Sequence, residues 1–206
     1  MLAVIDYGAG NLQSVLHALH HLNAQHIRLV RAPADLQGAT KIILPGVGAF
    51  GQGMEQLRHQ GLIPPLIEAI EHGIPYLGIC LGMQFLFEQS DEIGTHQGLG
   101  ILQGHVQRFP SDPRLKVPHV GWNQVAIDKP SALLDGVADG DYFYFVHSHY
   151  CVPAHADDRL LSTDYGKPFA SAVQRANVYG VQFHPEKSQQ LGLTILSNFL
   201  RLAESD

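Results

Sequence analysis

Short apolar runs alternate with helix-like stretches over the first half of the chain. The apolar runs predict strands at residues 2–5, 26–30, 41–44 and 75–79. The helix-like stretches predict helices at residues 12–22, 54–58, 62–72 and 83–87. Strands that alternate with helices are typical of a parallel sheet covered on both faces, so an α/β fold is expected.

The pattern changes after residue 98. Strand-like runs now follow one another directly, broken by Gly, Pro and Asp turns, at residues 101–109, 119–127, 142–152, 159–163, 170–174 and 178–183. They predict an antiparallel extension of the sheet, which makes it mixed but mostly parallel, and a closing helix is expected at 189–202. No internal repeat or low-complexity tract interrupts the chain, so residues 1–206 are expected to form a single domain.

Composition narrows the class of protein. The 206 residues are 45% apolar and 16% charged, which argues against disorder and allows a sizeable core. The formal net charge is −6 and no run of lysine or arginine occurs, so a nucleic-acid partner is not expected. Two cysteines do not make a disulfide framework. Without a signal segment or membrane span, the chain is expected to be cytoplasmic and to bind no membrane.

Cys80 is the first candidate for chemistry, because it stands at the turn from an apolar run into a predicted helix. The carboxyl edge of such a sheet is where open α/β folds bind ligands. The helix N-terminus favours a thiolate there, and Gly78 and Gly82 leave the sharp turn uncrowded and let a substrate approach the backbone. The alternative is that Cys80 packs as a small buried hydrophobe.

His184, Pro185 and Glu186 form the second candidate. Pro185 favours extended geometry for His184, and in an extended segment residues two apart share a face. The Glu186 carboxylate can therefore hold one nitrogen of the His184 ring and leave the other free as a base. With Cys80 as nucleophile, these residues make up a catalytic triad for acyl transfer.

The segment 76–84, Tyr-Leu-Gly-Ile-Cys-Leu-Gly-Met-Gln, together with His-Pro-Glu at 184–186, resembles the triad-type (class I) glutamine amidotransferases. Further stretches at 5–12, 45–50, 118–123, 142–148 and 186–188 resemble the glutaminase subunits of imidazole glycerol phosphate synthases, enzymes of histidine biosynthesis. The resemblance runs from residue 5 to the last helix. It implies a flavodoxin-like fold, hydrolysis of glutamine to glutamate and ammonia through a cysteine thioester, and no cofactor.

The resemblance also implies how the substrate is held. One oxyanion donor is expected at the Leu81 amide, directly after the nucleophile, and a second at the Val47–Gly48 peptide. The residues expected to bind glutamine are Gly46, Gln84, Ser148 and His149. Many relatives have tyrosine where His149 stands, so the assignment of His149 rests on its backbone.

A partner is expected because free ammonia would be lost to water and the chain has no room for a synthase domain. The resemblance implies a (β/α)8-barrel cyclase subunit, in a one-to-one heterodimer, that receives the ammonia. The residues that it places toward the partner are Pro118, His119, Trp122, Asn123, Tyr142, Tyr144 and Lys187. For each of them, a solvated or buried structural role is the alternative.

Other functions remain open from the sequence. Residues 46–51 satisfy the dinucleotide pattern G-x-G-x-x-G, but the next strand ends in Ile79-Cys80 without the acidic residue that a nucleotide ribose needs. A nucleotide-dependent oxidoreductase is therefore a remote alternative. Nearer ones are a glutaminase subunit of another synthase, a γ-glutamyl hydrolase and an inactive regulatory subunit.

The remaining metal-binding and thiol residues predict no further site. Three helix histidines and a strand pair lack partners at a recognised metal-ligand spacing, so no metal is expected; they are His17, His20, His21, His147 and His149. Cys151 has no neighbouring base in the sequence and is expected to be structural.

Overall fold

A mixed sheet runs through both halves of the molecule in the computed structural model, which describes residues 1–8, 10–111, 113 and 115–202. At one end, strands lie parallel in the order β2-β1-β3-β4-β14. Their bounds are β1 Leu2–Ile5, β2 Ile27–Val30, β3 Lys41–Gly46, β4 Tyr76–Cys80 and β14 Val178–Val181. β1 and β4 are buried at every position, as expected for strands covered on both faces.

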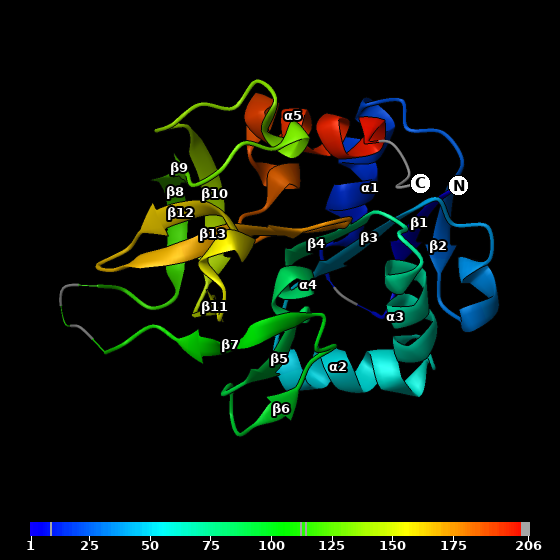
Figure 1. Ribbon diagram of the computed structural model, residues 1–206, viewed down its shortest axis with the longest axis horizontal. Coiled ribbons are helices and arrows are strands. Elements are labelled where there is room, and N and C mark those ends of the chain that lie inside the picture. The colour runs from blue at the N-terminus through cyan, green and yellow to red at the C-terminus, as the bar shows by residue number, and fades with distance from the viewer. Residues whose placement is uncertain (9, 112, 114, 203–206) are drawn as a thin grey trace.

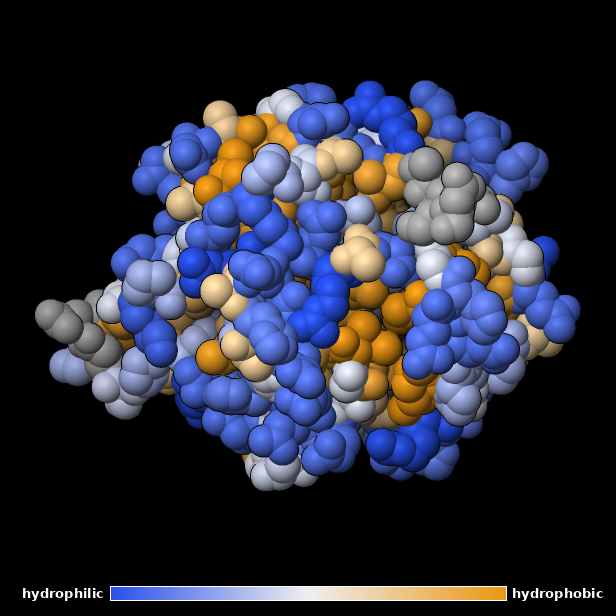
Figure 2. Space-filling model, in the orientation of Figure 1, coloured by the Kyte–Doolittle hydropathy of each residue, from blue (hydrophilic) through white to orange (hydrophobic). Residues whose placement is uncertain are grey.

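Helices cover both faces of this parallel part (Figure 1). The core on one face joins α1 (Leu12–His21) and α5 (Gln189–Arg201) to Val4 of β1. The core on the other face joins α2 (Phe50–His59) and α3 (Ile63–Glu71) to Ala3 and Ile5. Neighbouring side chains of one strand thus enter opposite cores. Figure 2 shows apolar side chains gathered around the packing of α2 and α3, framed by hydrophilic ones.

The sheet continues from β14 through β13, β11, β7, β5 and β6, with β12 and β9 alongside β13. Their bounds are β5 Phe87–Ser90, β6 His96–Gln97, β7 Leu102–Arg108, β9 Ala126–Ile127, β11 His149–Pro153, β12 Arg159–Asp164 and β13 Pro168–Arg175. Most of these pairs are antiparallel, although β5 and β7 are parallel. The mixed, mostly parallel sheet with an antiparallel extension is therefore confirmed.

A separate two-stranded antiparallel sheet pairs β8 (His119–Gln124) with β10 (Tyr142–His147). Short helices complete the described chain: α4 at Leu81–Gln84, η1 at Pro33–Leu36, η2 at Ala132–Leu134, η3 at Ala156–Asp158 and η4 at Pro185–Lys187. Ala9, part of the stretch 5–12, and residues 203–206 of the expected domain lie outside the described residues.

Four details of the expected elements are wrong. The run 119–127 is two strands in two different sheets, β8 paired with β10 and β9 paired with β12, separated at Val125. The helix predicted at 83–87 ends at Gln84, and Phe87 begins β5, because pairing with β7 holds this segment extended. The run 142–152 is two strands in two different sheets, separated at Ser148. The run 178–183 is not antiparallel to its inner neighbour: β14 lies parallel to β4. That last difference decides the geometry of the site.

Candidate active site

Cys80 ends β4 and begins α4 in a conformation that is rare for a residue with a side chain, φ 53° and ψ −105°. Such strain is kept only where the surroundings enforce it, and it is common at functional sites. Here the enforcing contacts include a hydrogen bond from the buried Tyr76 hydroxyl to the Gly82 carbonyl, 2.9 Å. Because α4 is one turn long, the helix dipole expected at Cys80 is weak.

Gly78 and Gly82 keep the sharp turn uncrowded, as expected. A Cβ on Gly78 would lie 2.3 Å from the Gly82 carbonyl oxygen, and a Cβ on Gly82 would lie 1.8 Å from that of Leu44. These glycines make room for the protein's own backbone at the tight turn, and not for a substrate.

The parallel register of β4 and β14 brings the second motif to Cys80. Val181 pairs with Ile79, so the chain leaving β14 runs past the cysteine. Gln182, the next residue, donates from Nε2 to the Cys80 sulfur at 3.5 Å. His184 is fully buried behind the cysteine, and its Nδ1 lies 2.7 Å from Oε1 of Glu186. The three residues of the expected triad therefore lie together.

The charge state of His184 depends on both partners. Burial opposes protonation of the ring, but the Cys80 sulfur and, after it, the Glu186 carboxylate outweigh burial and raise the pKa of His184 to about 10. Nε2 of His184 has no hydrogen-bond partner among the described residues. Catalytic hydrogen bonds often align only when substrate is bound. An imidazolium beside sulfur favours the nucleophilic thiolate.

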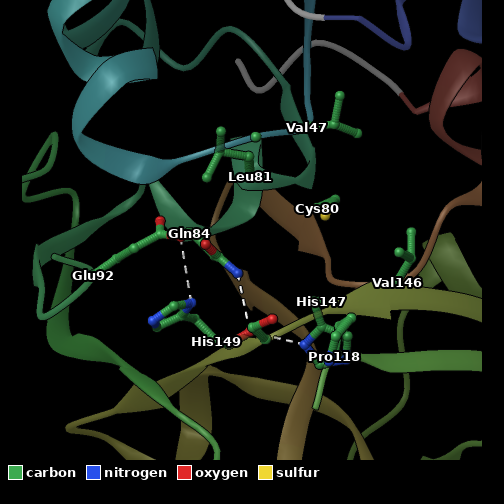
Figure 3. Close-up of a pocket in the computed structure, with 11 residues that line it drawn as sticks. Val47, Cys80, Leu81, Gln84, Glu92, Pro118, Val146, His147 and His149 are labelled. Atoms are coloured by element: carbon green, nitrogen blue, oxygen red, sulfur yellow. Dashed lines mark hydrogen bonds and ion pairs between the residues drawn. The ribbon is translucent and has the colours of Figure 1, made fainter.

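A pocket of about 240 Å³ opens over Cys80 (Figure 3). Its lining residues are Val47, Gly48, Cys80, Leu81, Gln84, Glu92, Pro118, Val146, His147, Ser148 and His149. Val47, Gly48 and Leu81, the residues expected to supply oxyanion donors, all line it. Gly46 does not: it is buried at the end of β3, where a Cβ would lie 2.1 Å from the Tyr7 hydroxyl. Gly46 is therefore needed for packing, and it lies outside the pocket lining.

The other expected substrate residues, Gln84, Ser148 and His149, also line the pocket. Gln84 donates from Nε2 to the His149 carbonyl and to Gln182 Oε1, both at 3.1 Å. The Ser148 carbonyl accepts from the Phe109 amide at 3.0 Å. The carbonyls of Ser148 and His149 are thus already engaged within the protein. The His149 side chain faces Glu92, with 3.6 Å between Nδ1 and Oε1 (Figure 3).

Two buried histidines, His147 and His119, adjoin this part of the pocket. His147 Nδ1 is 2.8 Å from the His149 carbonyl, and His147 Nε2 is 3.0 Å from His119 Nδ1. Since a carbonyl only accepts, His147 donates from Nδ1 and accepts from His119. Burial lowers the pKa of His147 to about 3 and that of His119 to about 4, so both rings are neutral at neutral pH.

Three polar residues of the site were missed from the sequence: Gln182 at the sulfur, Glu92 in the pocket, and Asn11, which bonds Glu186. Asn11 lies within the stretch 5–12 that carries the family resemblance, and Gln182 lies two residues before His184. In both cases, closeness in sequence to a recognised motif is the signal that could have found the residue. Glu92 follows β5, part of which the sequence predicts as helix, so the pattern gives no signal that Glu92 faces the pocket.

The residues expected to face a partner divide into two groups. Trp122 and Tyr142 are 45% and 51% exposed, and with Val120 (55%) they form what we term the β8–β10 patch. Tyr144 meets Trp122 edge-on at 6.0 Å, and Lys187 is exposed on η4.

His119 and Asn123 differ: the His119 ring is buried, and the Asn123 amide bonds to His119 and to the Asp164 carbonyl. His119 therefore presents no surface to a partner, while Pro118 lines the active-site pocket.

In the part of the chain that the structure describes, no group of three or more His, Cys, Asp or Glu side chains could hold a metal ion. Within the same residues, no helix is both long and apolar enough to cross a membrane. Cys151 is buried in the core on β11, and burial raises the pKa of its thiol well above the usual value.

The sequence of this chain matches one protein family and is similar to several named proteins. The family described as "Glutamine amidotransferase class-I" matches residues 3–203. A protein of Syntrophotalea carbinolica named "Imidazole glycerol phosphate synthase subunit HisH" is 48% identical over 97% of this chain and 98% of its own length. A protein of the same name from Aquifex aeolicus is 47% identical over 98% and 96%. "Imidazole glycerol phosphate synthase hisHF, chloroplastic" of Arabidopsis thaliana is 43% identical, and this chain matches 34% of its length.

Structure comparison agrees on the fold. A structure of PurLQS from Thermotoga maritima superposes with a TM-score of 0.75 over 97% of this chain and 96% of that one, at 20% identity. A structure described as a glutamine amidotransferase gives 0.74 over 97% of both chains, at 18% identity. At such low identity, the likeness shows a shared fold.

Proposed function

The chain belongs to the class-I glutamine amidotransferase family, and we propose that it is the glutaminase subunit of an imidazole glycerol phosphate synthase. The observation that carries this proposal is the meeting of Cys80, His184 and Glu186 under one pocket, in a chain that matches named subunits over nearly its whole length. The reaction is hydrolysis of the glutamine carboxamide to glutamate and ammonia.

The first step is attack by the Cys80 thiolate on the carboxamide carbon. The S–C bond forms, the C–N bond breaks, and His184 gives its proton to the departing nitrogen, which leaves as ammonia. Glu186 holds the His184 ring by its Nδ1 and stabilises the imidazolium before that transfer. The product of this step is a γ-glutamyl thioester on Cys80.

The second step releases glutamate. Neutral His184 takes a proton from water, the hydroxyl bonds to the thioester carbon, and the S–C bond breaks to restore the thiolate and imidazolium. Both steps place negative charge on the carbonyl oxygen. We assign its stabilisation to backbone N–H groups of Leu81 and of the Val47–Gly48 segment, which line the pocket beside Cys80; such a donor contributes roughly 3 kcal/mol.

Glu92 is suited to bind the α-amino end of glutamine, away from the carboxamide. A free amino acid carries an ammonium group, and Glu92 supplies a carboxylate to the described pocket lining. Its Oε2 accepts from the Phe50 amide at 2.6 Å, which fixes the side chain at the start of α2. We assign the α-ammonium group to Glu92 and keep Gln84 as a substrate contact in the same pocket.

We propose a separate cyclase subunit of (β/α)8-barrel form as the ammonia acceptor, bound one to one. The Arabidopsis protein is about three times as long as the match, as expected if both activities share one chain there. The β8–β10 patch is the surface that we assign to the partner, because exposed aromatic residues are typical anchors of interfaces. Tyr144 lies on β10, Pro118 directly precedes β8, and Lys187 ends η4.

Two further proposals concern the chain as a whole. We propose that residues 1–206 act as a single glutamine amidotransferase domain, supported by a sheet in which strands of both halves pair directly. We also propose that the protein works in the cytoplasm, because Cys80 and Cys151 are free thiols, as is usual in reducing compartments.

The test combines labelling and reconstitution with the full-length chain. A diazoketone analogue of glutamine should add to Cys80, as located by mass spectrometry, and Cys80→Ala should abolish both the adduct and glutaminase activity. The matched control Cys151→Ala should retain both. The barrel cyclase with its nucleotide substrate should co-purify with the chain and convert glutamine nitrogen into imidazole glycerol phosphate. Glutaminase activity without any transfer to this cyclase would instead indicate another synthase or a γ-glutamyl hydrolase.

A further inference from the structure

Asn11 stands at the N-cap of α1 but does not cap it. Asparagine is favoured there because its side-chain oxygen usually accepts from the first turn of the helix. In the described structure the Asn11 side chain makes no such bond. Instead it is buried, 5% exposed, and its Nδ2 donates to Glu186 Oε1 at 3.2 Å, across 175 residues of sequence. A side chain suited to helix capping is thus used at the triad.

Glu186 depends on this contact. Its side chain is fully buried, and the oxygen that binds Asn11 also accepts from His184 Nδ1 at 2.7 Å. Oε2 is buried without a partner among the residues described. A buried carboxylate is costly unless donors satisfy it, and here two donors converge on one oxygen while the other has none.

We propose that Asn11 is a positioning residue for glutamine hydrolysis: its amide fixes the Glu186 carboxylate, which in turn orients His184 toward Cys80. The inference rests on the proposed function. Asn11 does not line the active-site pocket, so it acts through Glu186 and not on the substrate. Without its amide, the carboxylate can rotate toward the cavity beyond it, which is lined by Ser14, His17 and Glu186 among others.

Two variants separate positioning from packing. Asn11→Ala removes the donor and should lower kcat about tenfold with little change in KM, because a hydrogen bond to a charged group is lost. Asn11→Asp keeps the shape of the side chain but places an ionisable oxygen against Glu186. When protonated it can still donate to Glu186, and when ionised it repels it.

The readout is the ratio of kcat for Asn11→Asp to kcat for Asn11→Ala as pH is varied. This ratio should fall by about tenfold as pH is raised from about 4 to about 9, because a carboxyl group beside a carboxylate loses its proton above the ordinary aspartate value. Besides His184, the titratable groups that face Glu186 are His17 and His21 across the cavity, with Lys187 next along the chain. All four are present in both variants, so their titration affects both rates.

Asn198 supplies the matched control. It is 2% exposed and donates to the carbonyls of Leu133 and Asp135, away from the triad. The ratio of Asn198→Asp to Asn198→Ala should not change with pH. A pH-independent ratio at Asn11, or the same trend at both positions, would overturn the positioning role while leaving the proposed function intact. A wild-type chain that hydrolyses no glutamine with the liganded cyclase present would overturn both.

Discussion

The side-chain amide of Gln182 donates to the Cys80 sulfur at 3.5 Å, across 102 residues of sequence. The oxygen of the same amide accepts from Gln84 at 3.1 Å. Gln182 has no exposed surface, so both bonds lie in the interior between β14 and α4. The Cys80 sulfur is therefore contacted by a residue that does not line the pocket.

Replacing Gln182 should weaken the nucleophile. In Gln182→Leu the sulfur loses its amide donor, and we expect labelling of Cys80 by the glutamine analogue to slow about tenfold, as for loss of a hydrogen bond to a charged acceptor. The rate of adduct formation is followed by mass spectrometry. Gln97→Leu, an exposed change on β6, should label at the wild-type rate. Equal rates for Gln182→Leu and wild type would show that the contact has no effect on reactivity.

Gly82→Ala should destabilise the fold. The added Cβ would lie 1.8 Å from the Leu44 carbonyl oxygen, so β3 and α4 must separate at the turn that holds Cys80. We expect a loss of about 3 kcal/mol or more in the free energy of unfolding, measured by urea denaturation. Gly10→Ala is the comparison, since its Cβ would meet the Val47 methyl at an ordinary 3.6 Å. Similar losses in the two variants would contradict the steric explanation.

Acid should destabilise the protein partly through His147, whose pKa burial lowers to about 3. An unfolded histidine titrates near about 6.5, so between the two values the unfolded state binds one more proton. The free energy of unfolding should therefore fall as pH is lowered from about 6.5 to about 3, by at most about 1.4 kcal/mol per pH unit for this residue. Urea denaturation of His147→Asn should show a shallower slope in this range. Parallel profiles for variant and wild type would refute the assignment.

Trp122→Ala should weaken the complex with the cyclase without unfolding the subunit. Trp122 is 45% exposed on the β8–β10 patch, and truncating an aromatic anchor costs about 2 kcal/mol, or about thirtyfold in Kd. Calorimetric titration gives Kd, and thermal unfolding of the isolated subunit should be unchanged. The control is Ile93→Ala, which removes an apolar side chain that is 89% exposed in the turn between β5 and β6. Equal affinities for both variants would place the partner on another surface.

Much of the first half was predictable because its elements are locally consistent. The strand at 2–5 is apolar at every position, and the segment of α1 has helical periodicity, so each element is specified by its own residues. The prediction failed at Phe87, whose segment is apolar and helix-compatible. Its extended state comes from pairing with β7, which is fifteen or more residues away.

The site residues also divide into those that the sequence predicts and those that only the fold reveals. Cys80, His184 and Glu186 were found from the sequence because nucleophile, base and carboxylate each carry a local signature in glycine and proline spacing. Glu92 and Asn11 carry none: one is an acidic residue in a turn, the other an asparagine before a helix. Their partners, the pocket and Glu186, are distant in sequence.

The chain of residues by itself determined which chemical groups are present and which local conformations they favour. Those two facts were enough to identify a thiol, an imidazole and a carboxylate suited to amide hydrolysis. Only the tertiary structure decided which of these groups meet and what holds them, because β14 lies parallel to β4 and in register with it. Contacts such as Gln182 with Cys80 and Asn11 with Glu186 depend on that long-range packing, and no local propensity specifies it.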